Sequence, residues 1–199
     1  MNIEDVLKQF VGGETHLRFN NVEVTPETIR AIMINEVVPS HSEEDFYGKQ
    51  DAAYMSTTIQ LFRKAGIEVD SVQDILNKGI YITNAVKIPK TEYAVSKESI
   101  EESLPYLERE LALFPNVKVI MLMGDVAKKI FNIISKRAVK KNAVPSVSTY
   151  KLRKTEILYN GIRILPSYIM TGQNILIEKS KFEMASEDIS IMYGLITKQ

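Results

Sequence analysis

An acidic segment that follows the first apolar run contains the first side chains that could act in catalysis or in ligand binding. It contains four acids and a histidine: Glu36, Glu43, Glu44, Asp45 and His41. A phosphate-binding loop needs glycines and free backbone N–H groups, and carboxylates would repel a phosphate, so a flavodoxin-like or P-loop nucleotide site is not expected. Hard cations do bind carboxylates. The spacing here is irregular, however, and it favours a solvated acidic loop over a metal site.

Three further segments carry polar side chains just where an apolar run ends. They are residues 83–87 with Asn84, residues 124–127 with Asp125, and residues 166–172 with Ser167, Tyr168 and Thr171. In open α/β sheets, ligands bind beyond the carboxyl ends of the strands. We therefore expect these segments and the acidic one to meet at one edge of a sheet.

Four apolar runs predict the strands of that sheet, at residues 29–34, 79–86, 117–123 and 162–165. Most are nearly continuous in Val, Ile, Leu and Met, which is typical of parallel strands covered on both faces. Apolar stripes of helical period lie at residues 52–62, 100–114, 126–134 and 182–196. The alternation predicts a single α/β domain over residues 1–199, a three-layer α/β/α sandwich around a mostly parallel, four-stranded sheet.

Local signals refine this outline. Residues 151–158, closed by Tyr159-Asn160-Gly161, are typical of a hairpin leading into the last strand. Ser96 or Ser99 could cap the helix that follows, and Pro105 should kink that helix or mark the start of its regular part. Residues 135–150 are basic and weakly periodic, which predicts an exposed loop.

The composition narrows the function classes. The chain has 199 residues and no cysteine, so disulfides, thiolate metal sites and iron–sulfur clusters are not expected. No apolar run is long enough to cross a bilayer, and the first residues lack a basic start and an apolar core. We expect a cytoplasmic monomer without a membrane partner.

A basic stretch could contact nucleic acid although the formal net charge is zero. Residues 126–163 hold ten Lys or Arg and a single acid, so this stretch carries +9 and the rest of the chain −9. A local basic face can supply phosphate contacts. The alternative is a solvated surface whose charges happen to cluster. The candidates for phosphate contacts include Lys128, Lys140 and Lys141.

Five segments, taken in order, resemble the uracil-DNA glycosylase superfamily, and its bacterial and archaeal iron–sulfur families most. The segments are Ile34-Asn35-Glu36 through Pro39, Phe46-Tyr47-Gly48, Tyr81–Lys87, Leu104–Ala127 and Leu165-Pro166-Ser167-Tyr168. The resemblance runs from about Ile32 to the final helix. It implies the fold predicted above, DNA as partner in single- or double-stranded form, and excision of a base by water attack. The cluster of the iron–sulfur families is not carried over, because the chain has no cysteine, and we expect no metal or cofactor.

The resemblance also implies roles for individual residues. Glu36 would orient the attacking water and stabilise positive charge on the sugar. Asn84 would read the base through its amide, and Phe46 or Tyr47 would stack on the extruded base. Residues that would touch the DNA backbone are Ser167, Tyr168 and Thr171. Each of these residues also has a purely structural interpretation. Glu36 could be a capping acid, Asn84 could bond its own backbone, and Phe46 or Tyr47 could be core aromatics. The residues after the last strand could form a polar turn.

Departures from the family pattern leave the activity open. Leu165 stands where the family has a histidine, and leucine cannot donate a hydrogen bond to a departing base. Ile88 stands near a usual cluster cysteine, and Asn35 replaces a glycine. One hypothesis is therefore a DNA repair glycosylase, for which Leu165→His would raise the rate. The others are a non-catalytic relative that binds nucleic acid or a base, and an α/β protein that shares only the fold.

Overall fold

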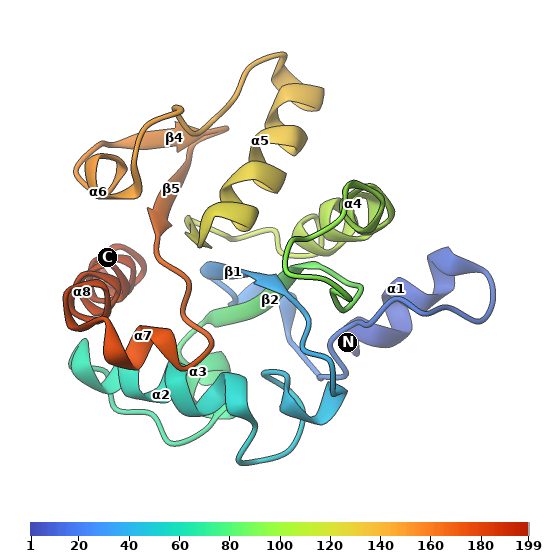
Figure 1. The fold of residues 1–199 in the computed structure, drawn as a ribbon, viewed down its shortest axis with the longest axis horizontal. Helices are drawn as coiled ribbons and strands as arrows, with labels where there is room; N and C mark the ends of the chain where they lie inside the picture. The colour runs from blue at the N-terminus through green and yellow to red at the C-terminus, as the bar shows by residue number, and fades with distance from the viewer. Residues whose placement is uncertain (199) are drawn as a thin grey trace.

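Five strands form one sheet in the order β2-β1-β3-β5-β4 in the computed structural model, which describes residues 1–198 (Figure 1). Their bounds are β1 Ala31–Val37, β2 Ile80–Val86, β3 Val119–Met123, β4 Ile157–Tyr159 and β5 Ile162–Ser167. β1, β2, β3 and β5 run parallel, and β4 is antiparallel to β5. The four parallel strands therefore end at the same edge of the sheet.

Helices cover both faces of the sheet, as Figure 1 shows. The helices are α1 Ile3–Val11, α2 Ala53–Lys64, α3 Val72–Asn77, α4 Lys97–Leu111, α5 Asp125–Val139, α6 Thr149–Leu152, α7 Asn174–Ile177 and α8 Lys179–Thr197, with 3-10 turns η1 Pro26–Thr28 and η2 Ser42–Glu44. α1, α4, α5 and α6 contribute side chains to one hydrophobic cluster on the sheet, α2, α7 and α8 contribute to the other, and α3 contributes to both. The expected three-layer α/β/α arrangement is confirmed.

Residues within each strand alternate between the two clusters. In β1, Ile32 and Ile34 face α4 and α5, whereas Ala31 and Met33 face α2 and α8. This period of two follows from the pleat of a β-strand. It also decides which side chains can meet at the carboxyl edge, because neighbours in sequence point to opposite layers.

The observed elements correct the sequence-based expectations in two places, the number of strands and the segment 135–150. The sheet has five strands rather than four, because the first arm of the predicted hairpin pairs with β5 as β4. The segment 135–150 is not all loop, since α5 continues to Val139 and α6 begins at Thr149. Pro105 lies inside a continuous α4, whose start is capped by Ser96 accepting from the Ser99 N–H at 3.1 Å.

One fully buried ion pair links β2 to α4. Lys87 lies at the end of β2 and donates to a carboxylate oxygen of Glu110; the two side chains are 1% and 0% exposed. The second oxygen of Glu110 accepts from Tyr81 at 2.6 Å and from Thr83 at 2.7 Å. A buried charge is tolerated when it is paired and hydrogen-bonded in this way.

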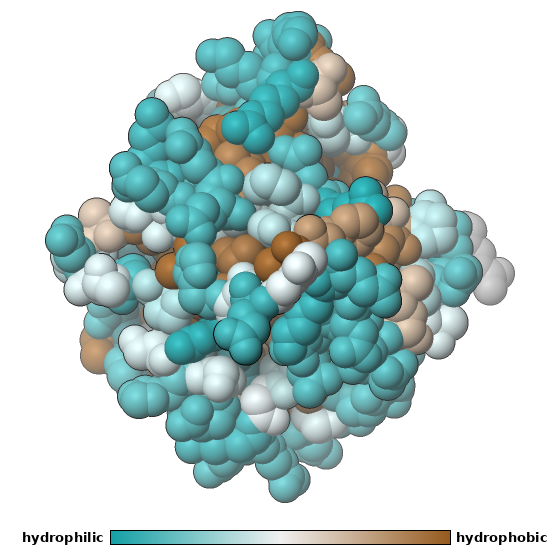
Figure 2. Space-filling view, turned by 90° about the vertical axis from the view of Figure 1, so that its right-hand side faces the viewer, coloured by the Kyte–Doolittle hydropathy of each residue, from teal (hydrophilic) through white to brown (hydrophobic). Residues whose placement is uncertain are grey.

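The surface on the α1 and α4 side is mostly hydrophilic, with hydrophobic side chains showing between the polar ones (Figure 2). A mainly apolar hollow of about 280 Å³ lies between α4 and α5, where Leu111, Phe114 and Ile134 line it. Among the described residues, no helix combines the length and apolar character needed to cross a membrane.

Candidate functional site

Glu36 lies at the end of β1 and reaches the start of α5. Its Oε1 accepts a hydrogen bond from the Val126 N–H at 3.1 Å. α5 has no side-chain cap of its own, since Gly124 occupies the N-cap position. The carboxylate thus accepts a hydrogen bond from an N–H group that has no partner within the helix, at the end where the helix dipole favours negative charge. Burial nevertheless outweighs these bonds and raises the pKa of Glu36 above its ordinary value.

Gly124 makes this contact possible. Its φ of 107° and ψ of 170° lie in a region that is essentially restricted to glycine. A Cβ atom at this position would lie 2.8 Å from Cδ of Glu36 and closer still to Oε1. The turn after β3 is therefore shaped around the carboxylate of Glu36.

Glu36 opens into a hollow of about 140 Å³ at the carboxyl edge of the sheet, here called the Glu36 hollow. It lies among the ends of β1, β3 and β5 and the starts of α5, α7 and α8. Its lining residues are Glu36, Gly124, Asp125, Thr149, Ser167, Tyr168, Ile169, Asn174, Ile175, Glu178 and Lys181. Three of these are acids and one is a lysine, so the hollow itself is not a phosphate site.

Asn84 belongs to a second, separate cluster. Its Nδ2 donates to both carboxylate oxygens of Asp45, at 2.8 and 3.0 Å, and its Oδ1 accepts from Asn35 Nδ2 at 2.8 Å. Asn84 is 1% exposed and Asn35 0%. Burial raises the pKa of Asp45 despite the bonds from Asn84 and from the Phe46 N–H. Both ends of the Asn84 amide are therefore occupied within the protein.

Glu36 and Asn84 do not face one pocket. Asn84 is the register partner of Asn35 on the adjacent strand, and the two side chains are bonded to each other on the α2 and α8 side. Glu36 is the next residue after Asn35, so its side chain points to the opposite layer, towards α5. Asn84 is also not among the residues that line the Glu36 hollow.

Phe46 and Tyr47, predicted to stack on a base, both lie against the protein interior. Phe46 is 1% exposed and packs on Tyr54, with ring centroids 5.2 Å apart. Tyr47 stacks on Tyr81 at 5.8 Å, and its hydroxyl accepts from the Ile82 N–H at 3.0 Å. Phe46 would have to move to receive a base, whereas Tyr47 is half-buried and lines a hollow of about 340 Å³. The stacking role stays a prediction.

Of the three residues after β5 that were predicted to touch DNA, two are buried and one is half-buried. Ser167 is 0% exposed and its hydroxyl donates to Asp188 at 2.6 Å, while Arg153 binds the same carboxylate at 2.8 and 2.9 Å. Thr171 is 7% exposed and donates to Asn35 at 3.4 Å. Tyr168 is half-buried and lines the Glu36 hollow. Of the three residues predicted to touch DNA, Tyr168 is thus the most accessible.

The three lysines predicted to bind phosphate differ in their exposure and in the contacts that they already make. Lys128 is held by Asp125 at 2.6 Å and by the Thr149 hydroxyl, and only 12% of its side chain is exposed. Lys140 and Lys141 are exposed at the end of α5 and in the loop behind it. Lys140 also closes α5 in a left-handed conformation, with a φ of 64°.

Leu165, at the position of the missing histidine, belongs to the apolar layer under α2 and α8 and is 7% exposed. It is the register partner of Met121, whereas Ser167 is the partner of Met123. Leu165 therefore lies two residues deeper than the edge, in the core. Leu165 is not among the residues that line the Glu36 hollow, so we expect no gain in rate from Leu165→His, and the sequence-based expectation of a faster variant stays to be tested.

The sequence reasoning missed Asn35 as a site residue and treated it only as a replacement for glycine. The signal that could have found it is strand alternation: Asn35, and not Glu36, shares a face with Met33 and the α2 side. His41 is exposed before η2 and is not among the residues that line the Glu36 hollow. Within residues 1–198, no three His, Asp or Glu side chains are grouped to hold a metal ion.

A comparison with protein families finds one matching model, described as the uracil DNA glycosylase superfamily, over residues 37–183. The match covers 147 of the 199 residues. It includes Asn84 and the segment after β5, and it begins one residue after Glu36. No curated protein matches the chain.

Proposed function

Because the chain belongs to the uracil-DNA glycosylase superfamily, we propose that it hydrolyses the N-glycosidic bond of uracil or another deaminated base in DNA. The observation that supports this most is the position of Glu36. A partly buried carboxylate with a raised pKa opens into a hollow at the edge where α/β folds bind their ligands.

Glu36 would act on the water. Its Oε1 is held by the Val126 N–H, so Oε2 is the atom to accept a proton from a water molecule in the hollow. The water oxygen attacks the anomeric carbon, the bond to the base nitrogen breaks, and the bonding electrons leave with the base. The raised pKa suits this role, because a base works best when its pKa lies near the working pH.

Asn84 would select the base. An amide that accepts from N3–H and donates to O4 matches uracil, whereas cytosine presents the reverse pattern. Both amide atoms are engaged, by Asp45 and by Asn35. Reading a base therefore requires Asp45 to move away from Asn84, and the extruded nucleotide to bridge the two sides of the sheet edge.

The departing base would receive little help from the protein. Leu165 supplies no donor. Among the described residues that line the Glu36 hollow, Lys181 is the only cation, and it pairs with Glu178 at 2.5 Å. The reaction then depends on the stability of the base anion. We expect slow cleavage, and preference for deaminated bases over the four normal ones.

A second candidate is a relative that binds a base or nucleic acid without cleaving it. One observation favours it: Leu165, at the position of the family's histidine, is buried in the core and supplies no donor to a departing base. A site that kept its shape and lost its leaving-group donor would bind without turnover.

Single-turnover cleavage tests the proposal. Oligonucleotides with one uracil, hypoxanthine or xanthine, single- and double-stranded, are incubated with excess protein and treated with alkali to reveal abasic sites. We expect product from the wild-type protein and about 10²–10⁴-fold slower product formation from Glu36→Gln. Glu98→Gln, an exposed acid on α4, is the matched control. Binding without product on all substrates selects the second candidate.

A further inference from the structure

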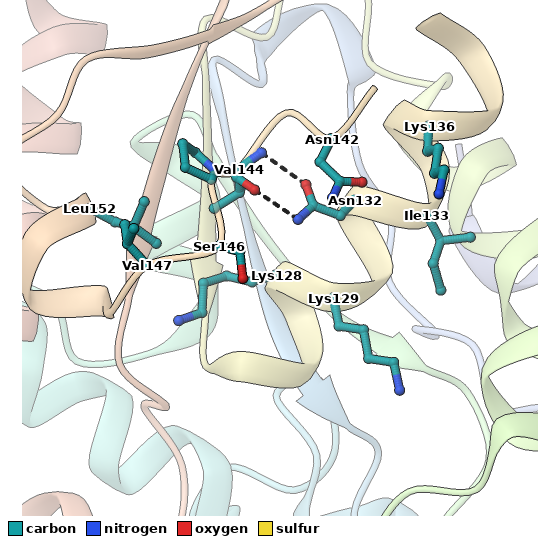
Figure 3. A pocket seen from close by; sticks show the side chains of 11 residues that line it. Lys128, Lys129, Asn132, Ile133, Lys136, Asn142, Val144, Ser146, Val147 and Leu152 are labelled. Carbon is teal, nitrogen blue, oxygen red and sulfur yellow. Dashed lines mark hydrogen bonds between the residues drawn. The ribbon is translucent and has the colours of Figure 1, made fainter. Parts of the chain in front are cut away.

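A larger hollow, of about 430 Å³, lies along α5 (Figure 3). Its walls are α5 on one side and residues 142–152 on the other. Three lysines of α5 line it: Lys128, Lys129 and Lys136. No acid is among its described lining residues. We call it the lysine hollow.

The wall opposite the lysines is held in place by two side chains of α5. The Asn132 amide donates to the Val144 carbonyl at 2.9 Å and accepts from the Val144 N–H at 2.8 Å, as the dashed lines in Figure 3 show. The Ser135 hydroxyl accepts from the Ala143 N–H at 2.9 Å and lies 3.1 Å from the Lys141 carbonyl. The loop is therefore fixed to the helix, and the hollow is formed before any ligand arrives.

Of the three lysines that line this hollow, only Lys128 has a carboxylate partner among the described ion pairs. Lys128 is neutralised by Asp125, but Lys129 and Lys136 are exposed and take part in none of the described ion pairs. They lie seven residues apart on α5, so both project on the same side of the helix. A fixed hollow with two free ammonium groups and no acid is suited to an anion.

The lysine hollow adjoins the Glu36 hollow through α6. Thr149, at the start of α6, lines the Glu36 hollow, while Leu152 at its end lines the lysine hollow. Lys128 and Asp125 join the two, because Lys128 binds both Asp125 and Thr149. A chain-like ligand could therefore run from one hollow to the other across α6.

α6 also carries an exposed aromatic residue, which directly follows Thr149 in the chain. Tyr150 is 54% exposed, and Lys154 Nζ lies 4.9 Å from the centre of its ring. Exposed aromatics beside cationic grooves are how proteins hold unpaired nucleotides, since every base can stack and every phosphate is anionic. A base paired inside a duplex could not stack in this way.

We propose that the lysine hollow binds phosphates of a single-stranded DNA segment adjacent to the target nucleotide, with one of its bases stacked on Tyr150. The inference rests on the proposed function for its choice of DNA. It explains how an acid-lined catalytic hollow can approach a polyanion: the phosphate charge is neutralised next to Glu36 and not within its hollow. Lys129 and Lys136 bind phosphate, and Tyr150 provides the preference for an unpaired strand.

The test uses undamaged DNA, so that it does not depend on cleavage. The probe is a labelled 20-nucleotide single strand without deaminated bases, and the same sequence as a duplex, titrated between 50 and 200 mM salt. Lys129→Gln/Lys136→Gln should reduce the salt slope of single-strand binding by about 1.4, from about 0.7 per phosphate contact. The control is Lys78→Gln/Lys118→Gln, which removes the same charge at the amino ends of β2 and β3.

Tyr150→Ala tests the preference for a single strand. It should weaken single-strand binding about 5- to 150-fold and leave duplex binding unchanged. Equal losses in the control double variant, equal losses on the duplex, or full displacement of the probe by millimolar inorganic phosphate at constant ionic strength would each overturn the inference. Urea midpoints of all variants establish that they fold. If the salt slope behaves as expected but no deaminated base is cleaved, the inference stands and the glycosylase proposal fails.

Discussion

The Asn84 side-chain nitrogen lies within hydrogen-bond distance of both carboxylate oxygens of a single partner, Asp45, at 2.8 and 3.0 Å. A base read by Asn84 would have to compete with this carboxylate. Asp45 therefore stands where a ligand of Asn84 would bind, and it is the residue through which base recognition can be tested most directly.

Asp45→Ala should change stability and base binding in opposite directions. Removing the acceptor leaves the buried Asn84 donor unsatisfied, which should lower the free energy of unfolding by about 1–3 kcal/mol. The same change frees Asn84 for a base, and should raise the affinity for a uracil oligonucleotide over a cytosine one by about 2- to 12-fold, the equivalent of one hydrogen bond. Urea denaturation and fluorescence titration measure the two effects.

Asp45→Asn is the matched control for that pair of measurements. Its side-chain oxygen can still accept from Asn84, so we expect a smaller stability loss and no gain in uracil affinity. A stability loss without any change in base preference in Asp45→Ala would mean that Asn84 is structural only.

The pKa of Glu36 predicts the pH dependence of cleavage. Burial raises this pKa, and a general base must be ionised, so the rate should fall as pH decreases through the raised value. The acidic limb of kcat/KM should therefore lie above about 4.3, the ordinary pKa of a glutamate. The limb should be absent from the residual rate of Glu36→Gln. A limb that persists unchanged in Glu36→Gln would belong to another group.

Gly124→Ala should displace Glu36. The new Cβ would meet the Glu36 carboxyl group, and alanine is strained at a φ of 107°. We expect a stability loss of about 1–3 kcal/mol and loss of cleavage comparable to Glu36→Gln. Gly66→Ala is the control, because Gly66, between α2 and α3, also has a positive φ, 81°, but a Cβ there would meet nothing within 4 Å. Normal cleavage in a folded Gly124→Ala protein would remove Glu36 from the mechanism.

The buried pair of Lys87 and Glu110 should show strong coupling. Either Lys87→Met or Glu110→Gln leaves a group in the core without its partner, which costs about 3–5 kcal/mol. The double variant removes both charges, so its loss should be smaller than the sum of the two single losses. Urea denaturation of the wild type, the two single variants and the double variant completes this double-mutant cycle. Additive losses would show that the two charges do not stabilise each other.

Leu165→His should not restore a catalytic histidine. The side chain would lie in the apolar layer beside Met121, two residues below the edge. Burying an unpaired imidazole there should cost about 1–3 kcal/mol, with no increase in the single-turnover rate. The alternative outcome, a faster enzyme, would require β5 to shift its register, and it would show as a changed protection pattern in hydrogen exchange.

Sequence periodicity was sufficient for the layers of this fold but not for the arrangement of its site. The buried parallel strands were predicted because both of their faces are apolar. β4 was missed as a member of the sheet because it has three residues and one exposed face, which is too short for a recognisable alternation of apolar and polar side chains. Glu36 and Asn84 were each placed correctly at strand ends. Their separation onto opposite layers depends on pairing register, since a shift of one residue exchanges the faces. Register is a tertiary property that a single sequence does not display.

Strand β4 also bears on how the protein behaves at high concentration. Without it, the six-residue β5 would present a free row of backbone donors and acceptors to any other extended chain. β4 covers that row with three residues and exposes only a short row of its own, which a second molecule can extend poorly. Leu158, 60% exposed on this strand, is the place where a lysine would protect the sheet margin further against intermolecular strand addition.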